Sequence, residues 1–253
     1  MYNLFTILNH AYIPFGKIWL NSMRDKINMN NVNNIFVVDT GLTEEDKTFL
    51  NQYDKVDILE SDIDIKRTSN SNITNSLWLQ HVLRKTVYLH KLIDRLPEEN
   101  FPIVMIDNDT MFLGDIEEFL DNSYDLQVCL RSYHKEKAAW IASFFVAHNK
   151  EKSKKFLEEW IQEIKDTMIT RPERKWFESF SLNSLLNRVI GQEKYKIGNL
   201  PTNIICCERP ESLTENTKMV HFKGDHEKSN IISRLQRFPF DSVLKKIEEY
   251  NNE

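Results

Sequence analysis

The chain has 253 residues, of which 41 % are hydrophobic and 28 % are charged, and its net charge at pH 7 is −5. This length and apolar content suffice for a buried core, which excludes a largely disordered chain. The acidic balance disfavours a nucleic-acid-binding protein, because such proteins carry a basic stripe and a high pI. We therefore expect no nucleic acid among its partners.

The cysteines and the terminal segment predict the compartment. Cys129, Cys206 and Cys207 form neither an even set nor a CxxC pattern, which is typical of reduced thiols and predicts a cytoplasmic protein. The N-terminus lacks a basic segment followed by a long apolar run, and no stretch approaches 18 apolar residues. We expect neither a secretory signal nor a transmembrane segment.

The first half of the chain alternates strand and helix patterns. Apolar runs predict strands at residues 4–8, 35–39 and 56–59. Pro14 opens a helical pattern, because proline suits the first turn of a helix. Thr43 precedes three acidic residues, which predicts a helix start, since threonine caps the end and the acids face the positive pole of the helix dipole.

The second half continues the alternation. The pattern predicts helices at 75–96 and 150–168 and strands at 102–106, 126–130 and 141–147. Such a chain is α/β, with a mixed, mostly parallel central sheet flanked by helices, and its ligands gather at the carboxyl ends of the strands. No linker divides the sequence, so we expect one domain over 1–253 with a C-terminal helical extension at about 230–253.

The strongest local signal is FPIVMIDNDTMFLGDIEEFL at 101–120, where an apolar strand ends in Asp107-Asn108-Asp109. Two neighbouring carboxylates repel each other, and a divalent cation relieves that repulsion. Mg²⁺ or Mn²⁺ is commonly held by a few carboxylates together with phosphate oxygens. One alternative is a strand that simply ends in a polar turn.

A second alternative is a phosphatase of the haloacid-dehalogenase type, in which Asp-X-Asp also follows an apolar strand and the first aspartate is a nucleophile. Those motifs usually lie near the N-terminus and continue with Gly-Thr. Here about a hundred residues precede the motif and Thr110-Met111 follows it, which disfavours the phosphatase.

The opening LFTILNHAYIPFGKIWLNSM, the segment LRKTVYLHKL and the acidic motif together resemble the GT-A fold glycosyltransferases, particularly the glycogenin and galactosyltransferase-like family 8. The resemblance keeps the same order from residue 3 to about 228. The resemblance implies that Leu8, Asn9 and Tyr12 face a uracil base and that Lys85 binds the donor. It implies a metal held by Asp107 and Asp109, with Asn108 between them near the donor, and a helix formed by LGDIEEFL.

The segment MVHFKGDHEK is similar to the family's His-x-x-Gly-x-x-Lys. The resemblance implies that His221 completes the metal site and that Gly224 and a lysine approach the diphosphate. Lys228 falls one residue late, so Lys223 is an alternative. A histidine after a short apolar strand is otherwise more often structural.

The chain departs from the family pattern in two places. Ala142-Ser143-Phe144 replaces Asn-Ser-Gly, and Glu178-Ser179 stands where Asp-Gln is usual. We expect Glu178 to act near the anomeric carbon, the alternative being an exposed carboxylate at a helix start. The identity of the sugar therefore cannot be carried over from the family.

The resulting expectation is a metal-dependent transferase that moves a sugar from a UDP-sugar to a carbohydrate, lipid-linked or protein acceptor, with retention of configuration. A catalytically weak sugar-nucleotide-binding protein of the same fold is the alternative. A homo-oligomer is left open.

Overall fold

The computed structural model describes residues 1–61, 76–131, 140–172, 177–208, 212–222, 245 and 249–250, with side chains from residue 84 onward in the helix that begins at 76. Its main sheet has seven strands in the order β3-β2-β1-β4-β7-β6-β8. The strands are β1 (Tyr2–Leu8), β2 (Val32–Asp39), β3 (Val56–Glu60), β4 (Ile103–Ile106), β6 (Leu126–Leu130), β7 (Trp140–Ala147) and β8 (Ile197–Pro201). β7 runs antiparallel to β4 and β6, whereas the other neighbouring pairs are parallel. The expected mixed, mostly parallel sheet is confirmed.

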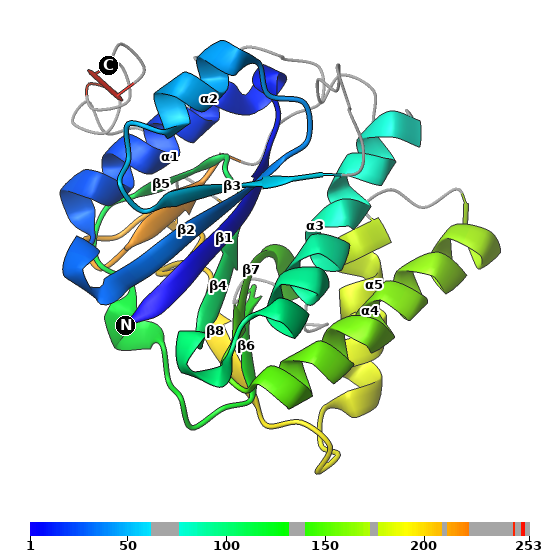
Figure 1. The fold of residues 1–253 in the computed structure, drawn as a ribbon. Helices are drawn as coiled ribbons and strands as arrows, with labels where there is room; N and C mark the ends of the chain where they lie inside the picture. The colour runs from blue at the N-terminus through cyan, green and yellow to red at the C-terminus, as the bar shows by residue number, and fades with distance from the viewer. Residues whose placement is uncertain are drawn as a thin grey trace.

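Helices cover both faces of this sheet (Figure 1). They are α1 (Ile13–Lys26), α2 (Glu44–Leu50), α3 (Ser76–Arg95), α4 (Lys150–Thr170) and α5 (Phe177–Val189). Successive side chains of a strand point to opposite faces, so β1 sends Leu4 to the core under α1 and α2 and Phe5 to the core under α3, α4 and α5. Burial on both faces explains why the strands are apolar along their length.

The helix starts follow the sequence signals. Pro14 lies in the first turn of α1, where its missing N–H costs no hydrogen bond. The Oγ1 atom of Thr43 accepts from the backbone N–H of Asp46, whose carboxylate accepts from the N–H of Thr43. This reciprocal pair is a capping box that satisfies two backbone donors of α2.

The region after β4 differs from the expectation. A two-stranded antiparallel sheet joins β5 (Thr110–Phe112) to β9 (Met219–His221). The helix expected over LGDIEEFL is reduced to a single 3₁₀ turn, Glu117–Phe119. The N–H groups of Leu113 and Gly114 both donate to the carbonyl of Lys218. Because this backbone is already paired with the C-terminal part of the chain, it does not form a longer helix.

The predicted C-terminal extension falls almost entirely outside the described residues, so that prediction stays open. Tyr250 is described; its side chain is buried and its hydroxyl lies 2.9 Å from Asp25 Oδ2.

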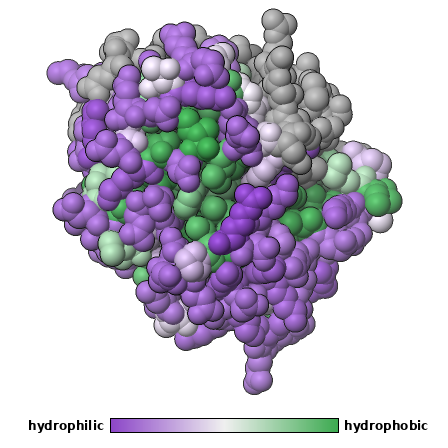
Figure 2. Space-filling model, in the orientation of Figure 1, coloured by the Kyte–Doolittle hydropathy of each residue, from purple (hydrophilic) through white to green (hydrophobic). Residues whose placement is uncertain are grey.

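Within the described part of the chain, no helix has the length and apolar character needed to cross a membrane. Figure 2 shows a mostly hydrophilic face with a hydrophobic area near its centre.

Candidate active site

The acidic pair lies at the carboxyl end of β4, near the middle of the sheet. The backbone N–H of Asp107 donates to the carbonyl of Ser143 over 3.0 Å, and Thr110 Oγ1 donates to the carbonyl of Asp107 over 2.9 Å. Asn108 is buried and donates its side-chain amide to the carbonyl of Ile7 at the end of β1. These bonds fix the turn, so that Asp107 and Asp109 project to the same side.

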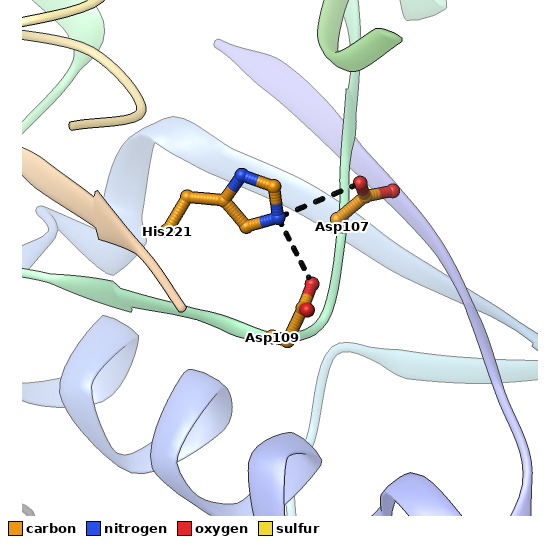
Figure 3. Close-up of side chains that lie close together, drawn as sticks. All are labelled: Asp107, Asp109 and His221. Carbon is orange, nitrogen blue, oxygen red and sulfur yellow. Dashed lines mark ion pairs between the residues drawn. The ribbon is translucent and has the colours of Figure 1, made fainter. Parts of the chain in front are cut away.

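His221 reaches this turn from the C-terminal part of the chain. It is the last residue of β9 and pairs with Thr110 of β5, while the N–H of Phe222 donates to the carbonyl of Asp109 over 2.8 Å. The Nε2 atom of His221 lies 3.2 Å from Asp109 Oδ1 and 3.8 Å from Asp107 Oδ2 (Figure 3). The structure therefore brings together the three residues expected to bind a metal.

This set of donors fits a divalent cation. One ligand atom from each of Asp107, Asp109 and His221 lies within 4.8 Å of the others. The side chains are 28 %, 15 % and 8 % exposed, respectively, so the acids retain a path to solvent or substrate. Carboxylate oxygens with an imidazole nitrogen suit ions such as Mn²⁺, which keep other coordination positions for water or phosphate.

The charges around His221 reinforce this fit. Burial lowers its pKa, but the neighbouring Cys206 and Asp109 outweigh burial and hold the pKa well above its ordinary value. In the absence of a cation, a protonated imidazole is thus the counter-charge of the acidic pair. Binding of a cation at Nε2 requires loss of that proton, so metal and proton compete for this position.

Lys85 lies behind Asp107 and is buried. Its Nζ atom donates to Asp107 Oδ1 and, over 3.1 Å, to the carbonyl of Ala142, and it lies 3.3 Å from Glu178 Oε2. Burial lowers the pKa of Lys85, yet the charges of Asp107 and Glu178 more than offset burial and raise it. An ammonium group has three donors, and the three neighbours match them, so Lys85 holds the two acids in place.

Glu178 lies in the first turn of α5 and is buried, so it is not the exposed helix-start carboxylate of the alternative expectation. Its Oε1 atom accepts from Thr86 Oγ1 over 3.2 Å. Burial raises the pKa of Glu178, Lys85 opposes the rise, and Asp107 adds to it, giving a value of about 7. A carboxyl group poised near neutral pH is a frequent feature of active sites.

The residues expected to face the uracil base lie where β1 ends. The Leu8 side chain is buried in the core, and Asn9 is also buried and accepts from the N–H of Tyr12 over 3.2 Å. Asn9 thereby caps the 3₁₀ turn His10–Tyr12. Tyr12 is partly exposed and packs against Phe15, with ring centroids 5.9 Å apart. Lys223, Gly224 and Lys228 lie outside the described residues.

The two departures in β7 have different surroundings. Ala142 contributes its carbonyl to Lys85. Phe144 pairs with Ile106 of β4, and its buried ring belongs to the core that faces α1. The bulky ring therefore fills the core and does not lie beside Lys85 and Glu178.

Cys206, Glu208 and Arg131 were not among the site residues expected from the sequence. Cys206 has a φ of 68° and places its Sγ 3.1 Å from Ser143 Oγ. Glu208 is buried and forms two hydrogen bonds with Arg131, from Nε over 3.0 Å and from Nη2 over 3.1 Å. Neither feature has a local sequence signal, because the partners are distant in the chain.

Comparisons with known proteins show the family and the fold. The sequence model of the nucleotide-diphospho-sugar transferase family matches residues 51–235. No curated protein matched the sequence.

Three solved structures share the fold. The galactosyltransferase LgtC, in complex with donor and acceptor sugar analogues, has a TM-score of 0.65 at 9 % identity, covering 99 % of this chain and 95 % of its own. The glycosyltransferase GlyE from Streptococcus pneumoniae TIGR4 has a TM-score of 0.61 at 12 % identity, and the match covers 100 % of this chain and 61 % of GlyE. The bifunctional glycosyltransferase WbbM has a TM-score of 0.56 at 13 % identity, and the match covers 100 % of this chain and 52 % of WbbM. The chain thus spans only part of GlyE and WbbM. Because the family match extends over more than half of the sequence, this chain belongs to the nucleotide-diphospho-sugar transferases and is a GT-A fold glycosyltransferase resembling family 8.

Proposed function

We propose that the protein transfers a sugar from a UDP-sugar to a hydroxyl-bearing acceptor with the help of Mn²⁺ or Mg²⁺, and that Asp107, Asp109 and His221 hold the ion. The observation that carries this proposal is the convergence of their three ligand atoms within 4.8 Å. An acidic turn at the end of a strand can also be purely structural. An imidazole delivered to it by a separate segment, in a family of sugar-nucleotide enzymes, favours a metal site.

The chemistry to be assisted is the departure of a nucleoside diphosphate. A bound divalent cation would act as a Lewis acid that neutralises charge on the leaving group. Asp107 and Asp109 would anchor the ion, and Lys223 or Lys228 would add positive charge near the diphosphate. Tyr12 would contact the uracil ring, while the buried Leu8 and Asn9 shape the turn that presents it.

Glu178 is our candidate for the group beside the anomeric carbon. Its carboxylate would stabilise positive charge on the sugar ring or orient the acceptor, and Lys85 would keep it and Asp107 in position. We propose retention of configuration, which the resemblance to family 8 supports. The sugar and the acceptor are to be determined by experiment.

The test is release of UDP from a panel of UDP-sugars with Mn²⁺. We expect slow release even without acceptor, faster release with one donor, and loss of both on chelation. Asp109→Asn should lower the rate by at least about 100-fold, because a metal ligand contributes several kcal/mol to the transition state. Asp57→Asn is the matched control, since Asp57 is exposed on β3.

Two outcomes would contradict the proposal. A protein that binds UDP and Mn²⁺ but releases no UDP from any donor, with any acceptor tried, would be the sugar-nucleotide-binding alternative. Metal-dependent release of inorganic phosphate from simple phosphomonoesters, without release of UDP, would indicate the phosphatase.

A further inference from the structure

We propose that Glu208 positions His221 for cation binding by accepting a hydrogen bond from its Nδ1–H group, with Arg131 fixing the carboxylate of Glu208. This inference deepens the proposed function and rests on it. Glu208 would act through His221, so it is a positioning residue.

The first step of the argument is the orientation of the imidazole. Its Nε2 atom faces Asp109 and Asp107, whereas its Nδ1 atom faces away from them, 3.6 Å from Glu208 Oε1. The Nδ1 atom is buried and has no hydrogen-bond partner within normal geometry among the described residues. A buried N–H without an acceptor costs about 1–3 kcal/mol, so a small inward shift of Glu208 would stabilise the site.

The second step is the requirement that a cation places on the histidine. A neutral imidazole that gives Nε2 to a metal carries its proton on Nδ1. Histidine ligands commonly donate a hydrogen bond from this N–H group to a carboxylate. The bond fixes the orientation of the ring and makes the ligand more basic. Glu208 lies on the side of the ring where such an acceptor is needed.

The third step is that the backbone holds Glu208 beside His221. The N–H of His221 donates to the carbonyl of Cys207, and the N–H of Cys207 donates to the carbonyl of Met219, each over 2.8 Å. The segment that carries Glu208 therefore lies along β9, opposite the side on which β5 pairs. His221 is held between the acidic turn on one side and residues 207–208 on the other.

The fourth step is that the acceptor is itself fixed. Arg131 follows β6 directly and binds both oxygens of Glu208. The two side chains are 16 % and 5 % exposed. Such a two-point bond restricts the carboxylate to one plane, and it leaves Oε1 next to Nδ1 of His221.

The experiment measures the affinity of the metal-free protein for Mn²⁺, from the signal of free Mn²⁺ in electron paramagnetic resonance. We expect Glu208→Ala to raise the Kd about 10- to 100-fold, the usual effect of losing an outer partner of a metal ligand. Glu208→Gln retains an oxygen acceptor and should recover part of this loss. The control is Glu159→Ala. Glu159 lies on α4 and binds Lys194 and Tyr195, so its loss should leave the Kd within twofold.

A Kd for Glu208→Ala within twofold of the wild type would overturn the inference, as would an equal loss of affinity in Glu159→Ala. Should the Glu208 variants fail to fold, the crystal structure of the wild-type protein with Mn²⁺ decides. We expect Nδ1 and Oε1 to close from 3.6 Å to hydrogen-bond distance; an Nδ1 atom bonded to Cys206 Sγ instead would refute it. A wild-type protein that binds no Mn²⁺ would refute the metal site and this inference together, whereas normal binding with an unaffected variant refutes the inference alone.

Discussion

The backbone N–H of Phe222 donates to the carbonyl oxygen of Asp109 over 2.8 Å. This bond joins the residue after His221 to the second acid of the turn that follows β4. It makes the position of the histidine relative to the acids a property of backbone pairing between β5 and β9. Backbone pairing therefore places the histidine at the acidic turn.

Lys85→Met should destabilise the metal-free protein by about 3–5 kcal/mol, because it leaves the buried Glu178 and the nearby Asp107 without their shared counter-charge. Chemical denaturation in EDTA measures this loss. The double variant Lys85→Met, Glu178→Gln should recover part of the stability, since a neutral amide at position 178 needs no counter-charge. Equal stability of Lys85→Met and the wild type would contradict this role.

Glu178 should make the metal-free protein less stable as the pH rises towards neutrality. Its pKa in the folded state is about 7, against an ordinary value of 4.5, so the folded state binds more protons between these values. The stabilisation is complete below about pH 4.5 and is lost as the pH rises through about 7. It amounts to about 3–4 kcal/mol, since each pKa unit corresponds to about 1.4 kcal/mol.

The test of the Glu178 effect compares urea midpoints at pH 5 and pH 8 in EDTA. The Glu178→Gln variant mimics the protonated form at every pH, so its stability should fall less between these two values. Parallel curves for the variant and the wild type would rule out the raised pKa.

His148, which lies outside the candidate active site, should give stability the opposite pH dependence. Burial lowers its pKa to about 4, and Asp121 opposes this shift only in part. The unfolded chain binds an additional proton between about pH 6.5 and pH 4, so stability is lost as the pH falls through that window. Allowing for the partial exposure of the ring, the effect is about 1–2 kcal/mol.

His148→Gln removes the titrating group and should flatten the acid side of the stability curve. Thermal melting at pH 4.5 and pH 7 measures the difference. A loss of stability that is the same in both proteins would assign the acid sensitivity to other groups.

Phe144→Leu should cost about 1–2 kcal/mol of stability, because the ring is buried in the core beneath α1. The choice among UDP-sugars should not change, and the rate of UDP release per folded molecule should stay within about threefold. A switch in the preferred donor would show instead that the ring contributes to sugar recognition.

The sequence by itself determined the elements and their class. Pro14 and Thr43 with the three acids after it marked helix starts, and continuous apolar runs marked strands that are buried on both faces. These signals are local, because they depend on backbone geometry and on spacing within one element. The acidic pair was visible for the same reason, since both acids follow one strand.

Only the tertiary structure decided how distant residues combine. It showed that Lys85 forms ion pairs with both Asp107 and Glu178, that the ring of Phe144 belongs to the core, and that Glu208 faces the Nδ1 atom of His221. It also replaced the helix expected at 113–120 by a pairing with the segment before β9. The physical reason is that burial and Coulomb interactions depend on distance in space, and a one-dimensional pattern does not contain that distance.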